Sequence, residues 1–260
     1  MTDPNVPVPD PAPPAEVRVA YHRELEDLNT RILQLGAMVC ETIPRGTEVL
    51  LGGDLQRARE LIESDDEIDQ LALQIEEDSF SILARQSPMA SDLRQVVTVT
   101  KLVAELERSA DLMINVCKAA RRMYGSPMSP RIRGVITNMS NQANKLLRLS
   151  LDAFADADVA LATALDDVDD TLDQLNRDMV AAIFEAHAEE EIDLAAAVQL
   201  ALVARYYERI GDHAVNIGER VTYMVTGWLP ENTGALRAQN RAEAIIESGD
   251  VVTPPPDGDD

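Results

Sequence analysis

The stretch ERIGDHAVNIGERV, residues 208 to 221, decides the fold, because a partial copy of it, ERSADLMINV, stands 101 residues earlier at residues 107 to 116. In the later copy Glu208, Asp212 and Asn216 recur every four residues, and the earlier copy keeps the same three residue types at the same places. A spacing of four places side chains on one face of an α-helix. Both copies are therefore predicted to be helices with a polar ridge beside an apolar stripe.

The same gap-free shift of 101 residues aligns further polar residues elsewhere in the chain. The aligned residues are Asp65, Asp66, Asp69 and Leu71 with Asp166, Asp167, Asp170 and Leu172; Asp92 and Leu93 with Asp193 and Leu194; and Glu107, Arg108, Asp111 and Asn115 with Glu208, Arg209, Asp212 and Asn216. Because these matches recur in register, we interpret them as an internal repeat of a three-helix unit.

The predicted fold class is all-α, built from two tandem three-helix bundles. Aromatic residues make up only 3% of the chain, and Gly and Pro are sparse in its middle, which favours long helices packed by aliphatic side chains. Six helices are expected at about residues 17–52 with a bend near Pro44, 55–87, 90–124, 128–155, 157–188 and 191–227.

The apolar stripes of the third and sixth helices predict the core. The stripe residues are Val96, Val99, Val103, Leu106, Ala110, Met113 and Cys117 in one repeat, and Ala197, Leu200, Ala204, Tyr207, Gly211, Ala214 and Gly218 in the other. Their alternation by three and four residues is typical of long helices that cross at a shallow angle.

The chain is expected to have four parts. Residues 1–15 are rich in proline and read as a flexible arm, residues 16–126 and 127–229 are the two repeats, and residues 230–260 are an acidic, mostly disordered tail with a short helix around 234–247.

The net charge of −23 argues against binding of nucleic acid and of anionic membrane surfaces. We find neither a signal peptide nor an apolar run long enough to span a membrane, so direct membrane insertion is not expected. Cys40 and Cys117 fall in apolar helical patterns and are expected to be reduced core thiols. A cytoplasmic protein is predicted.

Four acidic pairs, each with a spacing of four, are candidate metal ligands. They are Asp65 with Asp69, Glu107 with Asp111, Asp166 with Asp170, and Glu208 with Asp212. If neighbouring helices bring two pairs together, four carboxylates repel one another and need cations, protons or arginines. Oxygen ligands suit a divalent or trivalent ion, with Mg, Mn, Fe and Zn as candidates, although they do not select structural zinc.

Two readings without metal stay open for these pairs. Each pair alone could be a solvated helix face, and Arg108, Arg205 and Arg209 could neutralise the ridges in salt bridges. A purely structural helical interaction protein would then result.

Catalysis finds little support in the sequence, and no enzyme is predicted. His213 follows Asp212 and could be a ligand, a partner of a ligand or a helix-surface residue, but no histidine follows a Glu by three positions as di-iron helical bundles require. Motifs for nucleophilic catalysis and phosphate loops are absent from the sequence. The alternative enzyme is a carboxylate-metal hydrolase or oxidase.

The acidic motif at residues 65–69, then ARQSPMASDLR (84–94), KLVAELERSADLMINV (101–116) and YYERIGDHAVNIGERV (206–221) resemble the PhoU family of phosphate-signalling regulators, most of all its actinobacterial branch. The resemblance covers about residues 18 to 227. It implies metal clusters at the eight acidic residues named above. The sequence ERSADLM departs from the family pattern, which usually has a glycine there, so the two sites are expected to differ in occupancy.

The resemblance also implies the function and the partners. We expect a negative regulator of phosphate uptake and of the phosphate-starvation response, which acts as an adaptor between a phosphate ABC transporter and a sensor histidine kinase. A homodimer is expected.

Overall fold

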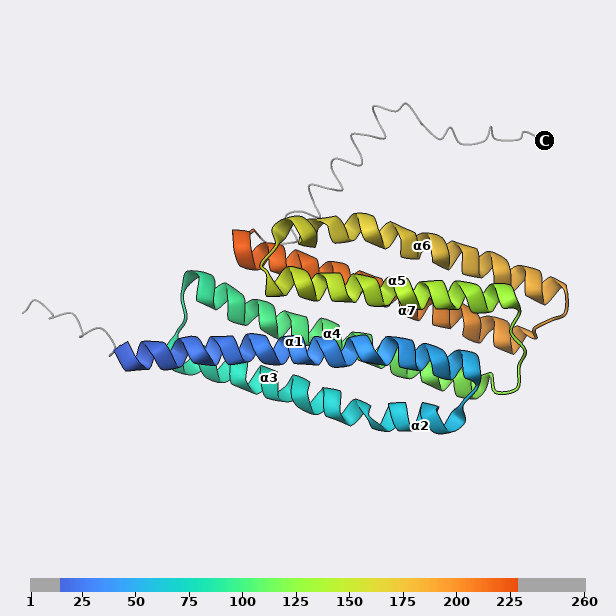
Figure 1. The fold of residues 1–260 in the computed structure, drawn as a ribbon, viewed down its shortest axis with the longest axis horizontal. Coiled ribbons are helices and arrows are strands. Elements are labelled where there is room, and N and C mark those ends of the chain that lie inside the picture. Colours follow the sequence, from blue (N-terminus) through green and yellow to red (C-terminus); the bar gives the residue numbers. More distant parts are fainter. Residues whose placement is uncertain (1–14, 229–260) are drawn as a thin grey trace, which may run out of the picture.

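The computed structural model describes residues 15 to 228, which form seven α-helices and no strand (Figure 1). The helices are α1 (Ala15–Gly52), α2 (Leu55–Glu63), α3 (Asp65–Gln86), α4 (Ala90–Arg122), α5 (Pro130–Ala155), α6 (Val159–Ala188) and α7 (Leu194–Thr226). The all-α prediction is confirmed. The short helix predicted at 234–247, the tail around it and most of the arm lie outside the described residues.

One predicted helix, 55–87, is two helices in the structure. The Asp54 side chain caps α2 by accepting hydrogen bonds from the backbone N–H groups of Gln56 and Arg57. The Ser64 hydroxyl donates to the carbonyl oxygen of Leu61 at 2.9 Å, and α3 begins at the next residue. A serine hydroxyl that bonds back to the preceding turn competes with the helix ladder. The other predicted helices match to within three residues at each end.

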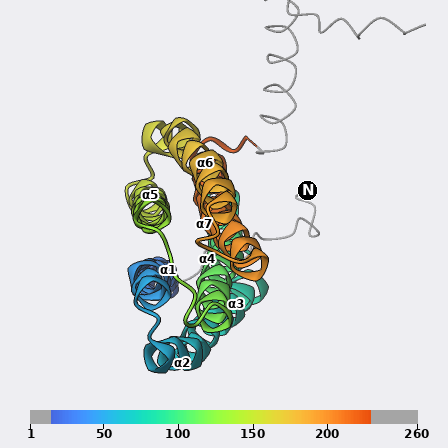
Figure 2. The same ribbon diagram turned by 90° about the vertical axis from the view of Figure 1, so that its right-hand side faces the viewer.

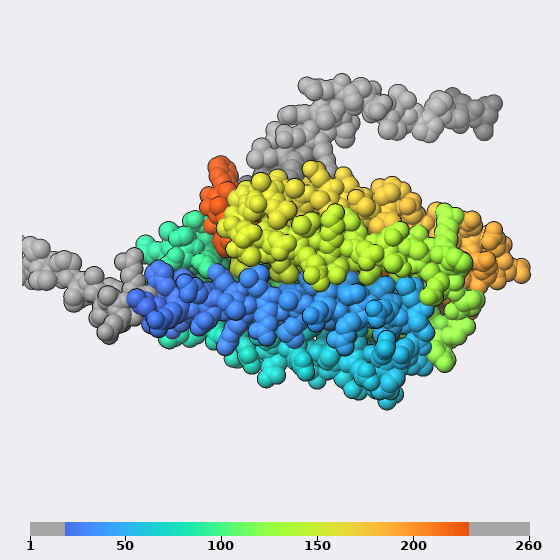
Figure 3. All heavy atoms as spheres, viewed as in Figure 1, coloured from blue at the N-terminus to red at the C-terminus, as the bar shows by residue number. Residues whose placement is uncertain are grey.

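The helices form two units, α1 to α4 and α5 to α7, related by a pseudo-two-fold axis. Figure 2 shows α1 beside α5 on one side and α4 beside α7 on the other, with α3 and α6 farther out. Arg94 near the start of α4 donates to the carbonyl oxygen of Met224 near the end of α7, and Arg122 at the end of α4 lies 3.4 Å from Gln199 near the start of α7. The two central helices are therefore antiparallel. The space-filling view shows α1 and α5 in contact along the opposite face (Figure 3).

The two units share one hydrophobic core. Every residue of the two predicted stripes is buried, which confirms the core assignment. The buried residues of α1, α4, α5 and α7 belong to a single contiguous cluster. The predicted boundary at residue 126 lies in the loop between α4 and α5. Cys40 and Cys117 are buried free thiols, and burial raises the pKa of each to about 11.

Close packing of α6 on α7 depends on a glycine. A Cβ atom at Gly218 would lie 2.7 Å from the backbone carbonyl oxygen of Ala162, a distance that side chains do not tolerate. We expect Gly218→Ala to lower the free energy of unfolding by about 1–3 kcal/mol, because α6 must move away. Urea denaturation measures the loss.

Gly134 supplies the matched control for this prediction. It also lies inside a helix, α5, but a Cβ atom there would meet nothing within 4 Å. Gly134→Ala should raise stability by up to about 1 kcal/mol through helix propensity alone. Equal behaviour of the two alanine variants would contradict the packing argument.

Candidate functional site: two carboxylate clusters

The first cluster contains all four acidic residues predicted for the first repeat, Asp65 and Asp69 on α3 with Glu107 and Asp111 on α4. The pKa of Asp65 is raised to about 6. Burial is the largest cause, and the charges of Asp69 and Asp111 add to it. The pKa values of Asp69 and Glu107 are raised in the same way, by burial and then by neighbouring carboxylates. The four side chains therefore act on one another as a single acidic group.

The second cluster differs from its prediction in one helix. Glu208 and Asp212 on α7 face Asp169 and Asp173 of α6, whereas Asp170 is exposed. Burial raises the pKa of Asp169 to about 7, with contributions from the charges of Asp173, Asp212, Asp166 and Glu208. Asp166 thus lies near the cluster as predicted, but the more buried α6 carboxylate is Asp169, which sequence reasoning missed.

The register of α6 explains the difference. The buried residues Ile68 and Ile75 of α3 correspond to Leu172 and Met179 of α6, a shift of 104 positions (172 − 68 and 179 − 75), while α4 and α7 keep the shift of 101. The run DDVDD, residues 166–170, offers acidic residues in both registers. The signal that could have decided between them is the apolar stripe of α6, because buried residues fix the face that a helix presents to its neighbour.

Gly211 allows Asp169 to approach α7. A Cβ atom at Gly211 would collide with Asp169 Oδ1 and lie 2.7 Å from Leu172 Cδ2. Asp169 Oδ1 is a buried atom without a hydrogen-bond partner. A carboxylate oxygen in this state is costly unless it gains a proton or a cation.

Arg205 distinguishes the second cluster from the first. Its guanidinium lies 2.5 Å from Glu208 Oε1 and 4.0 Å from Asp212 Oδ2, and Asn176 of α6 donates to Glu208 Oε2 at 2.8 Å. The equivalent of Arg205 in α4 is Ala104 (205 − 101), which carries no charge. The second cluster therefore has an internal counter-charge that the first lacks at this place.

The donor chemistry of both clusters fits a hard cation, because the ligands on offer are carboxylate oxygens and Asp169 Oδ1 has no partner. Within residues 15–228, however, no three His, Cys, Asp or Glu side chains are already arranged as a ligand group. A cation would have to draw the carboxylates together.

The raised pKa values predict that the metal-free protein is least stable in alkaline solution. The folded-state pKa values of Asp65 and Asp169, about 6 and 7, exceed the unfolded value of about 3.9. Their contribution to unfolding free energy is therefore fully present below the unfolded pKa and is lost as pH rises through 6 to 7. Because both groups are only partly buried and solvent screens their charges, we expect a fall of only about 1–3 kcal/mol in unfolding free energy from pH 5.5 to pH 8.

Urea denaturation in the presence of a chelator, repeated along the pH series, measures this change. The double variant Asp65→Asn, Asp169→Asn should flatten the profile. Stability that stays constant or increases toward pH 8 in the unmodified protein would contradict the prediction.

His213 lies in the interface between the repeats and not on the helix surface. Its Nδ1 donates to Glu105 Oε2 of α4 at 2.5 Å, and Asn216 also donates to that oxygen at 3.3 Å. The two side chains of the pair are 7% and 13% exposed. Burial alone would raise the pKa of Glu105, but the hydrogen bonds from His213 and Asn216 lower it below its usual value. The surface reading of His213 is therefore wrong, and the residue joins α7 to α4.

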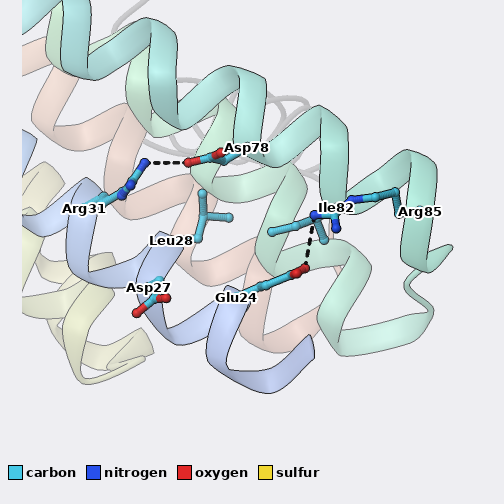
Figure 4. Close-up of a pocket in the computed structure, with 7 residues that line it drawn as sticks. All are labelled: Glu24, Asp27, Leu28, Arg31, Asp78, Ile82 and Arg85. Carbon is cyan, nitrogen blue, oxygen red and sulfur yellow. Dashed lines mark hydrogen bonds and ion pairs between the residues drawn. The ribbon is translucent and has the colours of Figure 1, made fainter. Parts of the chain in front are cut away.

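A charged hollow between α1 and α3 has a structural explanation. Figure 4 shows Arg31 directed at Asp78 and Arg85 at Glu24, with N–O distances of 2.5 and 3.4 Å. Since each arginine has a carboxylate partner, the hollow is not a free anion site. Two ion pairs across the hollow join α1 to α3.

In the described part of the chain, the helices are too polar or too short in their apolar runs to cross a membrane.

The family model described as the PhoU domain matches the chain twice, at residues 32–120 and 136–221. The two matches begin 104 residues apart (136 − 32) and end 101 residues apart (221 − 120). This difference agrees with the register found for α6 and α7.

Curated relatives match over most of the chain. A protein of Mycobacterium tuberculosis named phosphate-specific transport system accessory protein PhoU homolog 1 is 31% identical over 82% of this chain and 96% of the relative. Homolog 2 of the same organism is 32% identical over 82% of this chain and its own full length. The mycobacterial relatives agree with the resemblance to the actinobacterial branch.

A solved structure gives the same result. The crystal structure of PhoU from Pseudomonas aeruginosa superposes with a TM-score of 0.74 at 32% identity, covering 80% of this chain and all of that one. Two family matches, relatives above 30% identity and a shared fold lead to one conclusion: this chain belongs to the PhoU family.

Proposed function

We propose that the protein is a negative regulator of phosphate uptake and of the phosphate-starvation response. It acts by binding, as an adaptor between a phosphate ABC transporter and a sensor histidine kinase in the cytoplasm, and it works as a homodimer. The proposal rests on the double match to the PhoU domain, together with relatives that are named as accessory proteins of phosphate-specific transport.

The acidic clusters support a binding function over a catalytic one. The cluster residues include no nucleophile and no histidine, and the nearby His213 is hydrogen-bonded to Glu105. Arrays of like charge on neighbouring helices suit the capture of cations and of basic protein segments.

The metal part of the proposal concerns these clusters. Asp65, Asp69, Glu107 and Asp111 would hold a cation in the first repeat, and Asp169, Asp173, Glu208 and Asp212 would hold one in the second, with Asp166 nearby. The predicted ligand Asp170 is not part of the proposed set, because its charge is not among those that raise the pKa of Asp169 or of Asp212. A bound cation would supply counter-charge, so that the carboxylates stay ionised and α3 stays joined to α4, and α6 to α7.

Deletion of the gene tests the regulatory proposal. We expect a phosphate-starvation reporter to become active in phosphate-rich medium, and the unmodified gene to restore repression. A reporter that stays silent in the deletion strain would contradict the proposal. Complementation with the Asp65→Asn, Asp69→Asn variant then asks whether repression needs the first cluster.

A further inference from the structure

An apolar patch covers the end of the molecule where α6 turns into α7. Its residues, which we call the α6–α7 patch, are Val180, Phe184, Leu194, Val198 and Leu202. Phe184 is 71% exposed and Leu194 67% exposed. Large apolar side chains gathered on one surface mark interaction sites more often than scattered ones do.

The patch is continuous with the second carboxylate cluster. Asn176 donates to Glu208, which fixes the place where α6 meets α7. From there Val180 and Phe184 follow on α6 at spacings of four, and because the helices are antiparallel, Leu202 and Val198 come roughly level with them on α7, with Leu194 at the start of that helix. The surface formed by α6 and α7 therefore carries acidic side chains near its middle and apolar side chains at its end.

The repeat shows that exposure of a phenylalanine at this place is not incidental. The chain has three phenylalanines, and two of them, Phe80 and Phe184, are more than half exposed. They occupy equivalent positions, because α3 and α6 correspond with a shift of 104 (184 − 80). Both copies of the repeat therefore present an aromatic side chain to solvent at the same place.

The first repeat keeps Leu93, 40% exposed, where the patch has Leu194, but it lacks other members of the patch. Glu76 stands where α6 has Val180, and Lys101 stands where α7 has Leu202. Val97, the equivalent of Val198, is partly buried. The repeats thus share the exposed phenylalanine and a leucine, but only the second adds Val180 and Leu202 beside them.

We propose that the α6–α7 patch and the adjoining acidic cluster together dock an amphipathic, basic helical segment of a partner protein. The apolar face of the segment covers Phe184 and its neighbours, and its lysines or arginines face Asp173, Glu208 and Asp212 in place of the cation that the second cluster would otherwise hold. Charge complementarity selects this occupant, because a cluster of carboxylates repels an anionic membrane surface and attracts basic peptide. Docking of an amphipathic helix in an apolar groove is a common mode of recognition.

This inference deepens the proposed function, since it names the surface by which the regulator would bind a signalling partner. The probe is a synthetic helix of about 18 residues, five turns, with leucines on one face and lysines on the other. A peptide of the same composition in scrambled order, without an apolar face, is the reference. Fluorescence anisotropy measures the dissociation constant against the full chain.

We expect Phe184→Ser to weaken binding of the amphipathic peptide by about tenfold or more, because an aromatic anchor at the centre of a patch dominates such contacts. Phe80→Ser is the matched control and should change the dissociation constant by less than about twofold. Asp173→Asn should weaken binding less than Phe184→Ser and reduce its dependence on salt, because it removes one charge only.

Three results would overturn the inference. Equal effects of Phe80→Ser and Phe184→Ser would show that the peptide binds without preference for the α6–α7 patch. Dissociation of a dimer by Phe184→Ser in analytical ultracentrifugation would assign the patch to a second copy of the chain. Co-flotation of the protein with anionic vesicles, lost in Phe184→Ser, would assign it to a membrane.

The test is independent of the reporter assay for the proposed function. A silent reporter in the deletion strain with an intact Phe184 effect would refute the regulatory role and keep the docking surface. An active reporter without an effect of Phe184→Ser would support the regulatory role and refute the docking surface.

Discussion

The His213→Leu variant should lose about 2–4 kcal/mol of unfolding free energy, the largest effect that we expect. Glu105 and His213 form a hydrogen bond of 2.5 Å inside the interface between α4 and α7. Removal of the imidazole leaves the Glu105 carboxylate buried with only the longer hydrogen bond from Asn216. Chemical denaturation at neutral pH, with circular dichroism as the signal, measures the loss.

The pseudo-two-fold axis provides the control. It relates Glu105 to Tyr206 and His213 to Leu112, so the reciprocal place in the interface is occupied by larger, less polar side chains. The double variant Glu105→Leu, His213→Leu should therefore recover most of the stability. If His213→Leu is as stable as the unmodified protein, the pair does not stabilise the interface.

Asp169→Asn should change unfolding free energy in the opposite direction. In the presence of a chelator at pH 8 we expect it to raise unfolding free energy by about 1–2 kcal/mol, because it removes a partly buried charge that four neighbouring carboxylates repel. The same substitution should weaken the stabilisation that millimolar Mn²⁺ or Mg²⁺ gives to the unmodified protein, as followed by melting temperature.

Asp170→Asn is the matched control for this prediction. The residue is adjacent in sequence and equally acidic, but it is exposed on α6. Its substitution should change stability by less than about 0.5 kcal/mol with or without metal. A result in which Asp170→Asn, and not Asp169→Asn, alters the metal response would restore the register of 101 residues for α6.

Much of the fold could be predicted from the sequence because its signals are local and repeated. The three-and-four alternation of Val96 to Cys117 fixes the buried face of α4, and Asp193 before Leu194 caps α7 as sequence rules suggest. The break at Ser64 was missed, since neither a glycine nor a proline marks it. Ser64 ends α2, and the acidic residues Asp65, Asp66 and Glu67 form the first turn of α3.

The structure brings together all four acidic residues that were predicted for one repeat, but only some of those predicted for the other. Asp65, Asp69, Glu107 and Asp111 come together because the helical spacing on α3 and α4 was sufficient to place them. On α6 a gap-free alignment chose Asp170, although the buried side chains Leu172 and Met179 turn Asp169 toward α7. The partner of His213 could not be predicted, because Glu105 is 108 residues away in sequence and only the packing of α4 on α7 joins them.

The antiparallel packing of α4 on α7 also bears on the ancestry of the chain. A single three-helix unit would leave the apolar face of its third helix uncovered, and a second copy turned by 180° would cover it, so an unfused ancestor would be a symmetric dimer. In such a dimer every contact occurs twice. The Glu105–His213 bond occurs once, opposite Tyr206 and Leu112. Fusion of the two copies removes the requirement for symmetry, and it allows each half to acquire residues that the other does not share.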